Sequence, residues 1–421
     1  VSPVVLMVQL GDIELLDYLI NKGLINPRHH KTLMLWVVGN NLLDTLKYLL
    51  DQGFTCNVAD EYGYTPLHIA CINNNIEMAK LLLEIGLDVN ALTKENITPL
   101  YFSIDNNYLE MVKLLLSYGA NPNIKAKTQL TPFHLAILKE NVELVQILIN
   151  KGANVNCHTD KSHIYALHDA TYNGNLEIIK LLIENGATIN AQSKNRITPV
   201  HNAVLLKHLD AVKLLIVHGA DLNLADNKGN TPLHSACRQN DLEMVKLLVE
   251  NGANYNRKAM HKETPLYIAI LNNNLEMAEY LLSVGADTNV RYYNQFYPLQ
   301  TAILNKNIDL VKLFIKYGVN VNKRMNGATP LYLAVLTGSK EMVELMLEHN
   351  ARINLISYYY TPFIFLTPVA LAHLKRKKEI LTIFKQHKDY SLIKSILLPE
   401  LLTLLLILCL ITPILLRLII V

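Results

Sequence analysis

Histidine is the residue type in this chain whose spacing most readily suggests chemistry. His68, His134, His168 and His234 recur at a regular interval, and we place His201 one position out of that register. Imidazoles bind metal ions and act as general bases. If the interval reflects a structural repeat, however, successive copies lie about one repeat apart, too far to share a metal at about 2 Å per ligand. We therefore expect these histidines to be structural, with no catalytic residue and no metal site.

The five cysteines lead to the same expectation. None forms a CxxC pair, and Cys71 and Cys237 take the same helical position in their repeats. We interpret the cysteines as small buried hydrophobic residues, a pattern that weakly favours a reducing compartment. The sequence shows no P-loop, no glycine-rich phosphate cradle and no nucleophile–base pair. We expect no enzyme activity, no cofactor and no small-molecule substrate.

One stretch, Gly229–Asn256, contains the elements that the rest of the chain copies. Thr231 and Pro232 are typical of a helix start, because Thr caps the first turn and Pro suits the first helical position. Asp241 is the cap expected for a second helix, and Gly252 should end it in the left-handed conformation. The apolar stripe of this second helix is predicted to be Val245, Leu247, Leu248 and Val249. One such pair cannot bury its own apolar face, so it needs a copy on each side.

The copies follow one another at about 33 residues. The helix-start pair recurs at Thr65, Thr98, Thr131, Thr198, Thr231 and Thr264, and once more, one residue short, at Thr329. Two expected positions in this series lack the Thr-Pro pair, and they are occupied by Tyr165-Ala166 and Tyr297-Pro298. A glycine stands 21 residues after each start, except where Asn350 replaces it. Asn also recurs four residues past each helix end, as at Asn123, where we expect it to bond its own backbone in a turn.

These motifs resemble those of the ankyrin-repeat family, whose unit carries T-P-L-H-x-A. The segments TPLHIAC from Thr65, TPFHLAI from Thr131 and TPLHSAC from Thr231 carry the likeness, which covers Ser2 to about His387. The resemblance implies an all-α solenoid of 11–12 helix-turn-helix units with β-hairpin fingers and a concave surface that binds macromolecules. It also implies that the repeated histidine forms hydrogen bonds within and between repeats. It names no partner, since one fold serves many functions.

The repeats also predict the domain organisation. We expect degenerate capping repeats at 1–60, regular repeats at 61–354, an insertion and a capping repeat at 355–390, and a hydrophobic tail at 391–421. The register slips by no more than one residue between Thr32 and Thr329, which favours a continuous superhelix. The first residue is Val1, already inside a repeat, so we expect a fragment or a processed product. A net charge of +3 is too small to favour nucleic acid as a partner.

The finger tips vary most between repeats, and variable loops on a rigid scaffold usually carry function. Basic residues exceed acidic ones there, most of all in the C-terminal half. Tyr residues cluster at two tips, and Tyr beside Arg is typical of binding hot spots. The expected site for an acidic protein segment comprises Arg257, Lys258, Lys262, Arg291, Tyr292, Tyr293, Lys323 and Arg324. A solvated face that contacts nothing is the alternative interpretation of these charges.

The composition changes abruptly near the C-terminus. Residues 401–416 carry no charge, and their length corresponds to about 24 Å of helix. Continued to Val421, the segment reaches the ~30 Å of a hydrocarbon core. We expect it to be a hydrophobic helix that enters a membrane, with the array on the cytosolic side; a buried terminal helix is the alternative. The membrane contacts are expected at Leu401, Leu404, Leu405, Leu408 and Leu415.

The sequence thus predicts a non-enzymatic scaffold that binds a protein partner and is tethered to a membrane. Three alternatives remain open at this point. The array could be part of a membrane channel or a latrotoxin-like pore-forming toxin, which would be secreted and act on a target membrane. It could also be the substrate-recruiting adaptor of a ubiquitin ligase, or the regulatory array of an enzyme. A cytoplasmic location is the alternative to the membrane.

Overall fold

The structure, a computed structural model, describes residues 13–25, 31–291, 297–357 and 366–391. The chain divides into two compact units, Val1–Asp221 and Leu222–Val421. Each unit consists of successive pairs of short helices, and eleven complete pairs follow one another among the described residues. This confirms the all-α repeat architecture expected from the sequence.

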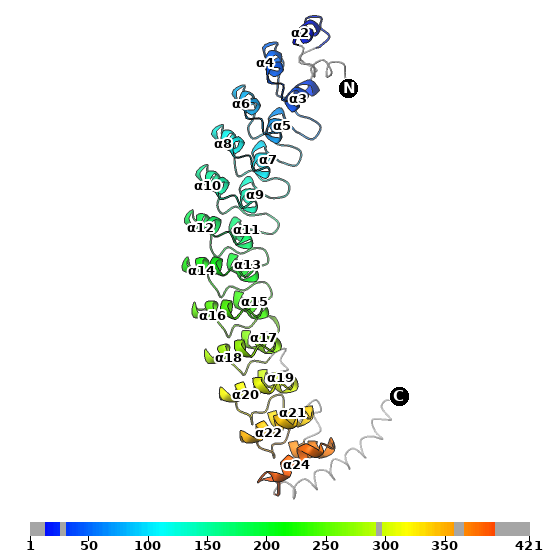
Figure 1. Cartoon of the computed structure of the whole chain (residues 1–421), viewed down its shortest axis with the longest axis vertical. Coiled ribbons are helices and arrows are strands. Elements are labelled where there is room, and N and C mark those ends of the chain that lie inside the picture. The colour runs from blue at the N-terminus through cyan, green and yellow to red at the C-terminus, as the bar shows by residue number, and fades with distance from the viewer. Residues whose placement is uncertain (1–12, 26–30, 292–296, 358–365, 392–421) are drawn as a thin grey trace, which may run out of the picture. The chain divides into compact units, whose positions relative to one another are not determined.

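In the N-terminal unit, two parallel rows of helices stack along the chain (Figure 1). The first helices of the pairs are α3 (Lys31–Gly39), α5 (Pro66–Ile72), α7 (Pro99–Asp105), α9 (Pro132–Leu138), α11 (Ala166–Asn173) and α13 (Pro199–Leu205). The second helices are α4 (Leu43–Asp51), α6 (Ile76–Glu84), α8 (Leu109–Ser117), α10 (Val142–Asn150), α12 (Leu176–Glu184) and α14 (Leu209–Val217). Before them stands α2 (Ile13–Asn21), without a described partner helix.

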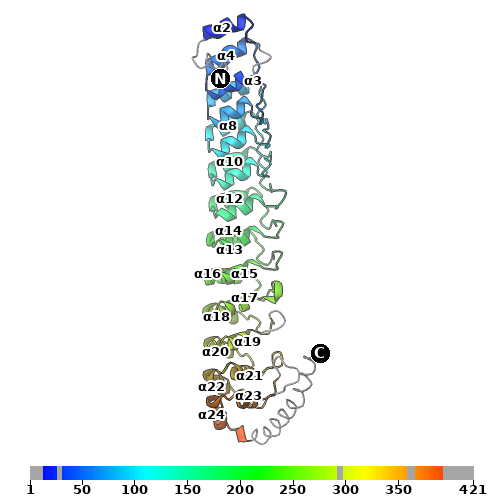
Figure 2. The same ribbon diagram turned by 90° about the vertical axis from the view of Figure 1, so that its right-hand side faces the viewer.

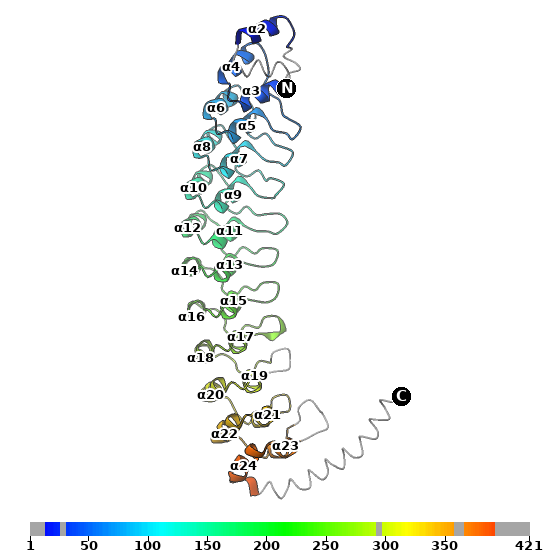
Figure 3. The ribbon, with the colours of Figure 1, turned by 45° about the vertical axis from the view of Figure 1, so that its right-hand side comes forward.

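The C-terminal unit repeats this arrangement, with finger loops leaving from the side of the first helices (Figures 2 and 3). Its first helices are α15 (Pro232–Arg238), α17 (Pro265–Leu271), α19 (Pro298–Leu304), α21 (Pro330–Thr337) and α23 (Pro368–Leu374). Its second helices are α16 (Leu242–Glu250), α18 (Leu275–Ser283), α20 (Ile308–Lys316), α22 (Lys340–Glu348) and α24 (Lys378–Gln386). A 3₁₀ turn, η1 (Met260–Lys262), lies in the finger before α17.

The repeat around α15 and α16 forms for the reasons its sequence indicates. Asp241 caps α16 by accepting a hydrogen bond from the backbone N–H of Met244 at 3.0 Å. Gly252, just after α16, has φ of 91°, the left-handed conformation that glycine tolerates best. The buried stripe of α16 differs slightly from the prediction: Met244, Val245 and Leu248 are buried, whereas Leu247 and Val249 are only partly so. Counted from Met244, the buried residues stand at positions i, i+1 and i+4 of the helix. These positions face the neighbouring helices more directly than i+3 and i+5, where Leu247 and Val249 stand.

The fingers are where the fold departs from expectation, because no strand forms in the described residues. Three isolated antiparallel bridges occur instead, His158 with Tyr165, Met325 with Ala328, and Ser357 with Leu366. Fingers that the structure describes in full close in a tight turn, as where Asp60 N–H donates to Tyr64 O at 2.9 Å, which leaves too few residues for a ladder. Neighbouring fingers are joined by single bonds, such as Lys94 N–H to Tyr62 O at 2.8 Å.

The recurring Asn after each second helix also acts differently from the prediction. Asn123 does not bond its own turn; its Nδ2 donates to Gly152 O at 3.0 Å and its Oδ1 accepts from Asn154 N–H at 2.7 Å, both in the next repeat. The bond within the turn comes from the residue two places earlier, where Asn121 Oδ1 accepts from Asn123 N–H at 2.9 Å. The recurring Asn is therefore a link between repeats rather than a local turn residue.

The predicted hydrophobic tail lies outside the described residues. So do Leu401, Leu404, Leu405, Leu408 and Leu415. Among the residues that the structure does describe, no helix has the length and apolarity to cross a membrane.

Candidate protein-binding surface

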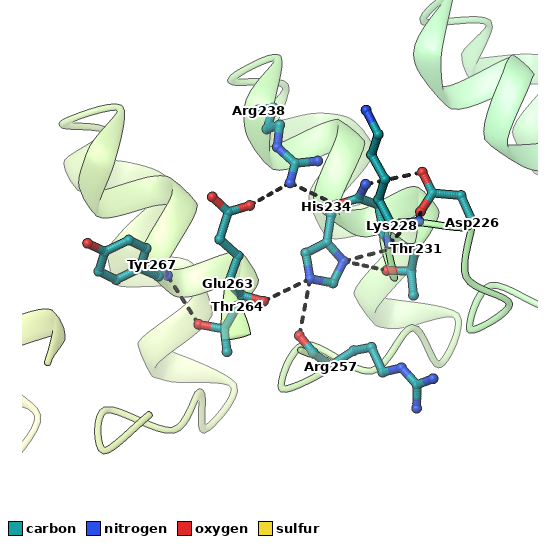
Figure 4. Close-up of polar contacts among 10 residues, drawn as sticks. Asp226, Lys228, Thr231, His234, Arg238, Arg257, Glu263, Thr264 and Tyr267 are labelled. Atoms are coloured by element: carbon teal, nitrogen blue, oxygen red, sulfur yellow. Dashed lines mark hydrogen bonds and ion pairs between the residues drawn. The ribbon is translucent and has the colours of Figure 1, made fainter. Parts of the chain in front are cut away.

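The repeated histidines are buried and carry structural hydrogen bonds. In the C-terminal unit, His234 Nδ1 accepts from Thr231 N–H at 3.2 Å, and Nε2 donates to Arg257 O at 3.1 Å in the following finger (Figure 4). This arrangement requires the neutral ring, with its proton on Nε2, as assigned from the bonding partners. Burial lowers the pKa of His234 to about 4, which keeps the ring neutral at physiological pH.

The same contacts recur in the N-terminal unit. His68 Nε2 bonds Ile97 O at 3.1 Å and His168 Nε2 bonds Ile197 O at 2.8 Å, each in the next finger. The prediction that His201 stands out of register was wrong, because its Nδ1 accepts from Thr198 N–H at 3.2 Å as the Nδ1 atoms of its counterparts do. It therefore stands in register and not one position away.

The Cys157 thiol beside His134 has the composition of a nucleophile–base pair. The thiol Sγ lies 3.5 Å from Nδ1 and 3.6 Å from Nε2 of the imidazole, and both side chains are buried. Burial raises the pKa of Cys157 to about 12 and lowers that of His134 to about 4. A thiolate–imidazolium pair is therefore disfavoured, and the thiol lacks the ionised form that nucleophilic chemistry requires. No group of three or more His, Cys, Asp or Glu suited to a metal ion occurs in the described parts of the chain.

The predicted basic residues are carried by three successive fingers of the C-terminal unit. In the first finger, Met260 N–H donates to Lys228 O at 2.8 Å in the preceding finger, and η1 turns the chain back toward α17. Lys262 ends this turn with φ of 66°. The side chains of Arg257, Lys258 and Lys262 are exposed as a result.

Three of these cations come together at one pocket. Lys258, Lys262 and Arg291 line a hollow of about 300 Å³ between two neighbouring fingers, with Asp287, Asn289 and Val290. One carboxylate thus faces three positive charges. Asp287 already uses Oδ1 to accept from Asn289 N–H at 2.8 Å in its own turn. The pocket therefore presents a net positive surface suited to carboxylate groups.

A tyrosine ring extends this surface toward the next finger. The guanidinium of Arg291 lies 5.4 Å from the centre of the Tyr297 ring, and the ammonium of Lys323 lies 5.9 Å from it. Lys323 also donates to Asn289 Oδ1. Cation–π contacts of this kind hold the two long side chains near each other. The cations of the second and third fingers are thereby joined into one patch.

Glu263, the acidic residue of the first finger, pairs with Arg238 and not with the cations of the pocket. Glu263 Oε2 accepts from Arg238 at 2.6 Å (Figure 4). The same guanidinium group donates to Asn230 Oδ1 at 2.8 Å. Arg238 comes from the end of α15, so the pair links a first helix to the following finger. Because Glu263 is bound to Arg238, it does not line the pocket of Lys258, Lys262 and Arg291.

The structure thus unites some predicted site residues and leaves others apart. Arg257 and Arg324 are exposed on the fingers but do not line the pocket. Tyr292 and Tyr293 lie outside the described residues. The residues predicted for this surface from sequence did not include Asp287 and Asn289. Their positions two and four residues after the helix-ending Gly285 could have indicated that they lie at the base of the finger.

Comparison with known proteins settles the family. The model for ankyrin repeats in three copies matches residues 4–93, 33–126, 85–159, 167–259, 200–292 and 266–357, which together span most of the chain. The chain belongs to the ankyrin-repeat family. Ankyrin repeats stack into extended surfaces for binding other proteins, so the chain is a protein-interaction scaffold by its fold.

One solved structure that this ankyrin chain resembles is the ankyrin repeat domain of Bcl-3, described as a unique member of the IkappaB protein family. The sequence identity is 31%, the match covers 49% of this chain and 95% of the other, and the TM-score is 0.46. No curated protein sequence matches this chain.

Proposed function

We propose that this ankyrin protein binds an acidic segment of a protein partner across the fingers of its C-terminal unit. The observation that carries the proposal is the pocket where Lys258, Lys262 and Arg291 face a single carboxylate, Asp287. A partner carboxylate there gains charge-assisted hydrogen bonds from donors held by neighbouring fingers. Arg257, Lys323 and Arg324 add positive charge around the pocket and strengthen the long-range attraction of an acidic partner.

The experiment uses a fluorescein-labelled octaglutamate peptide and measures its binding by fluorescence anisotropy over a range of salt concentrations. The variant carries Arg257→Glu, Lys258→Glu, Lys262→Glu and Arg291→Glu together. We expect its affinity to fall by at least about tenfold and its salt dependence to flatten, because the attraction is electrostatic and screened by ions.

A matched control reverses four exposed lysines on the second helices of the same unit, Lys246, Lys312, Lys316 and Lys340. This control changes the net charge equally but leaves the fingers intact. We expect it to weaken binding far less than the finger variant does. Equal losses in the two variants would mean that net charge alone drives binding, and a silent finger variant would overturn the proposed site.

We further infer from the sequence that residues 401–421 tether the protein to a membrane. The support is the absence of charge over 401–416 in a chain whose repeat helices are amphipathic. The basic residues of the last repeat, among them Lys375, Arg376, Lys377 and Lys378, would then keep the array on the cytosolic side.

A further inference from the structure

A second pocket, of about 300 Å³, lies within the N-terminal unit. Its wall is formed by α11, by the start of α13 and by the fingers that precede these two helices. The volume is at the lower end of the range of small ligand sites, about 300–1,000 Å³. The lining that matters here consists of Ile164, His168, Asp169, Tyr172, Ile197 and Asn202.

The unusual group in this pocket is the carboxylate of Asp169. Its Oδ2 atom is buried and has no hydrogen-bond partner. Burial raises the pKa of this carboxyl group to about 7, and no neighbouring cation counters that effect. A buried charge without a partner is costly, so the pocket holds an acceptor that still lacks its donor.

Two polar side chains that line the pocket beside Asp169 are committed to other partners. His168 uses both ring nitrogens, since Nδ1 accepts from Tyr165 N–H at 3.3 Å and Nε2 donates to Ile197 O at 2.8 Å. Asn202 Nδ2 donates to His168 O at 3.2 Å. None of the described residues that line the pocket is Lys or Arg. A cation that pairs with Asp169 would therefore come from outside this pocket's own wall.

We propose that this pocket binds an arginine side chain of a protein partner, with its guanidinium group on Asp169. A guanidinium group supplies both the positive charge and the paired donors that a carboxylate accepts. Tyr172 is 60% exposed, which leaves its ring accessible for stacking on the guanidinium plane. Ile164 and Ile197 offer apolar surface to the methylene groups of the arginine. The proposal does not depend on the acidic-segment site, because it concerns another unit and the opposite charge.

The test uses N-acetyl-arginine methylamide as the ligand and the full chain labelled with ¹³C at the Asp carboxyl carbons. Spectra are recorded at pH 8, where the Asp169 carboxyl is ionised. The other titratable groups near it are His168 and Tyr172 on its own helix and Cys157, whose thiol senses the Asp169 charge. We expect the Asp169 signal to shift in a saturable way, with a dissociation constant on the order of millimolar for a single side chain.

The neutral control ligand is N-acetyl-citrulline methylamide, which has nearly the same shape as the arginine compound but no charge. We expect it to bind at least about tenfold more weakly, because only the charged group forms charge-assisted bonds. Asp169→Asn should abolish the response, detected then through backbone amide signals of Tyr172 and Asn202. Asp210→Asn, which changes an exposed acid on α14, should leave arginine binding unchanged.

A second variant guards against a fold defect in Asp169→Asn. Tyr172→Ala changes an exposed ring and should weaken arginine binding severalfold while the helices remain intact by circular dichroism. Equal binding of the arginine and citrulline compounds would overturn the proposal, as would arginine binding that survives in Asp169→Asn. The absence of any saturable shift in the native chain at tens of millimolar would overturn it too.

Discussion

At the scale of single residues, the sequence marks two types most clearly, the helix-ending glycine and the buried histidine. The glycine allows a left-handed backbone conformation, and the histidine forms hydrogen bonds with backbone atoms. Gly252 has φ of 91°, and a Cβ added there would meet no atom within 4 Å. The requirement for glycine is thus one of backbone conformation alone. Asn350 takes the same place in a later repeat with φ of 63°, which shows that Asn is accepted there.

Gly252→Val should therefore lower the free energy of unfolding by about 1–2 kcal/mol, because a β-branched residue is strained in the left-handed region. Gly252→Asn is the matched control and should cost clearly less, as the chain itself uses Asn at this place. Thermal unfolding of the two variants beside the native protein measures the difference. Equal losses would show that something other than φ matters at this position.

The histidines make stability depend on pH. The pKa of His234 is about 4 in the folded protein and near 6.5 in the unfolded chain, so between these values the unfolded chain binds more protons. Stability is fully present above about pH 6.5 and is lost as pH falls toward 4. Gln300 takes the equivalent place in α19 and keeps both bonds, since its Oε1 accepts from Tyr297 N–H at 3.1 Å and its Nε2 donates to Met325 O at 2.7 Å.

His234→Gln should consequently keep the stability at pH 7 within about 1 kcal/mol, because Gln replaces both hydrogen bonds. At pH 4.5 the variant should be more stable than the native protein by roughly 2 kcal/mol, since one titrating group is gone. Urea unfolding at the two pH values gives the comparison. Parallel losses in both proteins on acidification would contradict the assigned role of His234.

At the scale of elements, each repeat is joined to the next by apolar packing and by polar links of known geometry. Second helices of successive repeats contribute fully buried side chains, among them Val112, Leu115, Val145 and Leu148. At several junctions the recurring Asn adds two hydrogen bonds near solvent, as Asn123 does toward Gly152 O and Asn154 N–H. Apolar packing thus stabilises the stack, and the Asn bonds set the position of one repeat on the next.

Asn123→Ala should lower stability by about 1–2 kcal/mol, because two inter-repeat bonds are lost while their partners regain only water. Exchange of the Asn154 amide hydrogen should accelerate locally. The matched control is Asn185→Ala, whose side chain bonds only Leu181 O within its own helix end at 2.8 Å. If the control changes Asn154 exchange as much as Asn123→Ala does, the inter-repeat link is not the cause.

At the scale of the whole molecule, the two sites proposed above would give this ankyrin scaffold more than one place for a partner. The cations of the C-terminal unit and the carboxylate pocket of the N-terminal unit have opposite charge. Each site lies between neighbouring fingers or first helices, where variable residues of two repeats meet. A partner that carries both acidic and arginine side chains would match both sites.

The hydrophobic tail is tested on the full chain and on a chain stopped after Tyr390. Because a charge-free run of this length would expose more apolar surface than soluble proteins usually tolerate, we expect it to enter lipid. Carbonate extraction of cells that express each form should leave the full chain with membranes and release the shortened one. Recovery of both forms in the soluble fraction would exclude the membrane anchor and favour a terminal helix that packs on protein.

The sequence by itself determined the repeat unit, its helix starts and its helix-ending glycines. These depend on contacts within a few residues, such as the cap of α16 by Asp241, and such contacts leave a periodic signature along the chain. The basic fingers followed from the same periodicity, whereas the hydrogen-bonding role of the repeated His followed from the resemblance to the ankyrin-repeat family. Sequence also predicted β-hairpin fingers, and this was wrong for the described residues, because turns this short close before a ladder can form.

Only the tertiary structure decided how residues from different repeats meet. The pocket of Lys258, Lys262 and Arg291 joins two fingers, and the pairing of Glu263 with Arg238 joins a finger to the helix before it. The unpartnered Oδ2 of Asp169 could not be found from sequence, because its burial depends on side chains from two repeats. The sign of each charge can be read directly from the sequence. Burial and pairing depend on which neighbours the stacking of the repeats brings within a few ångströms.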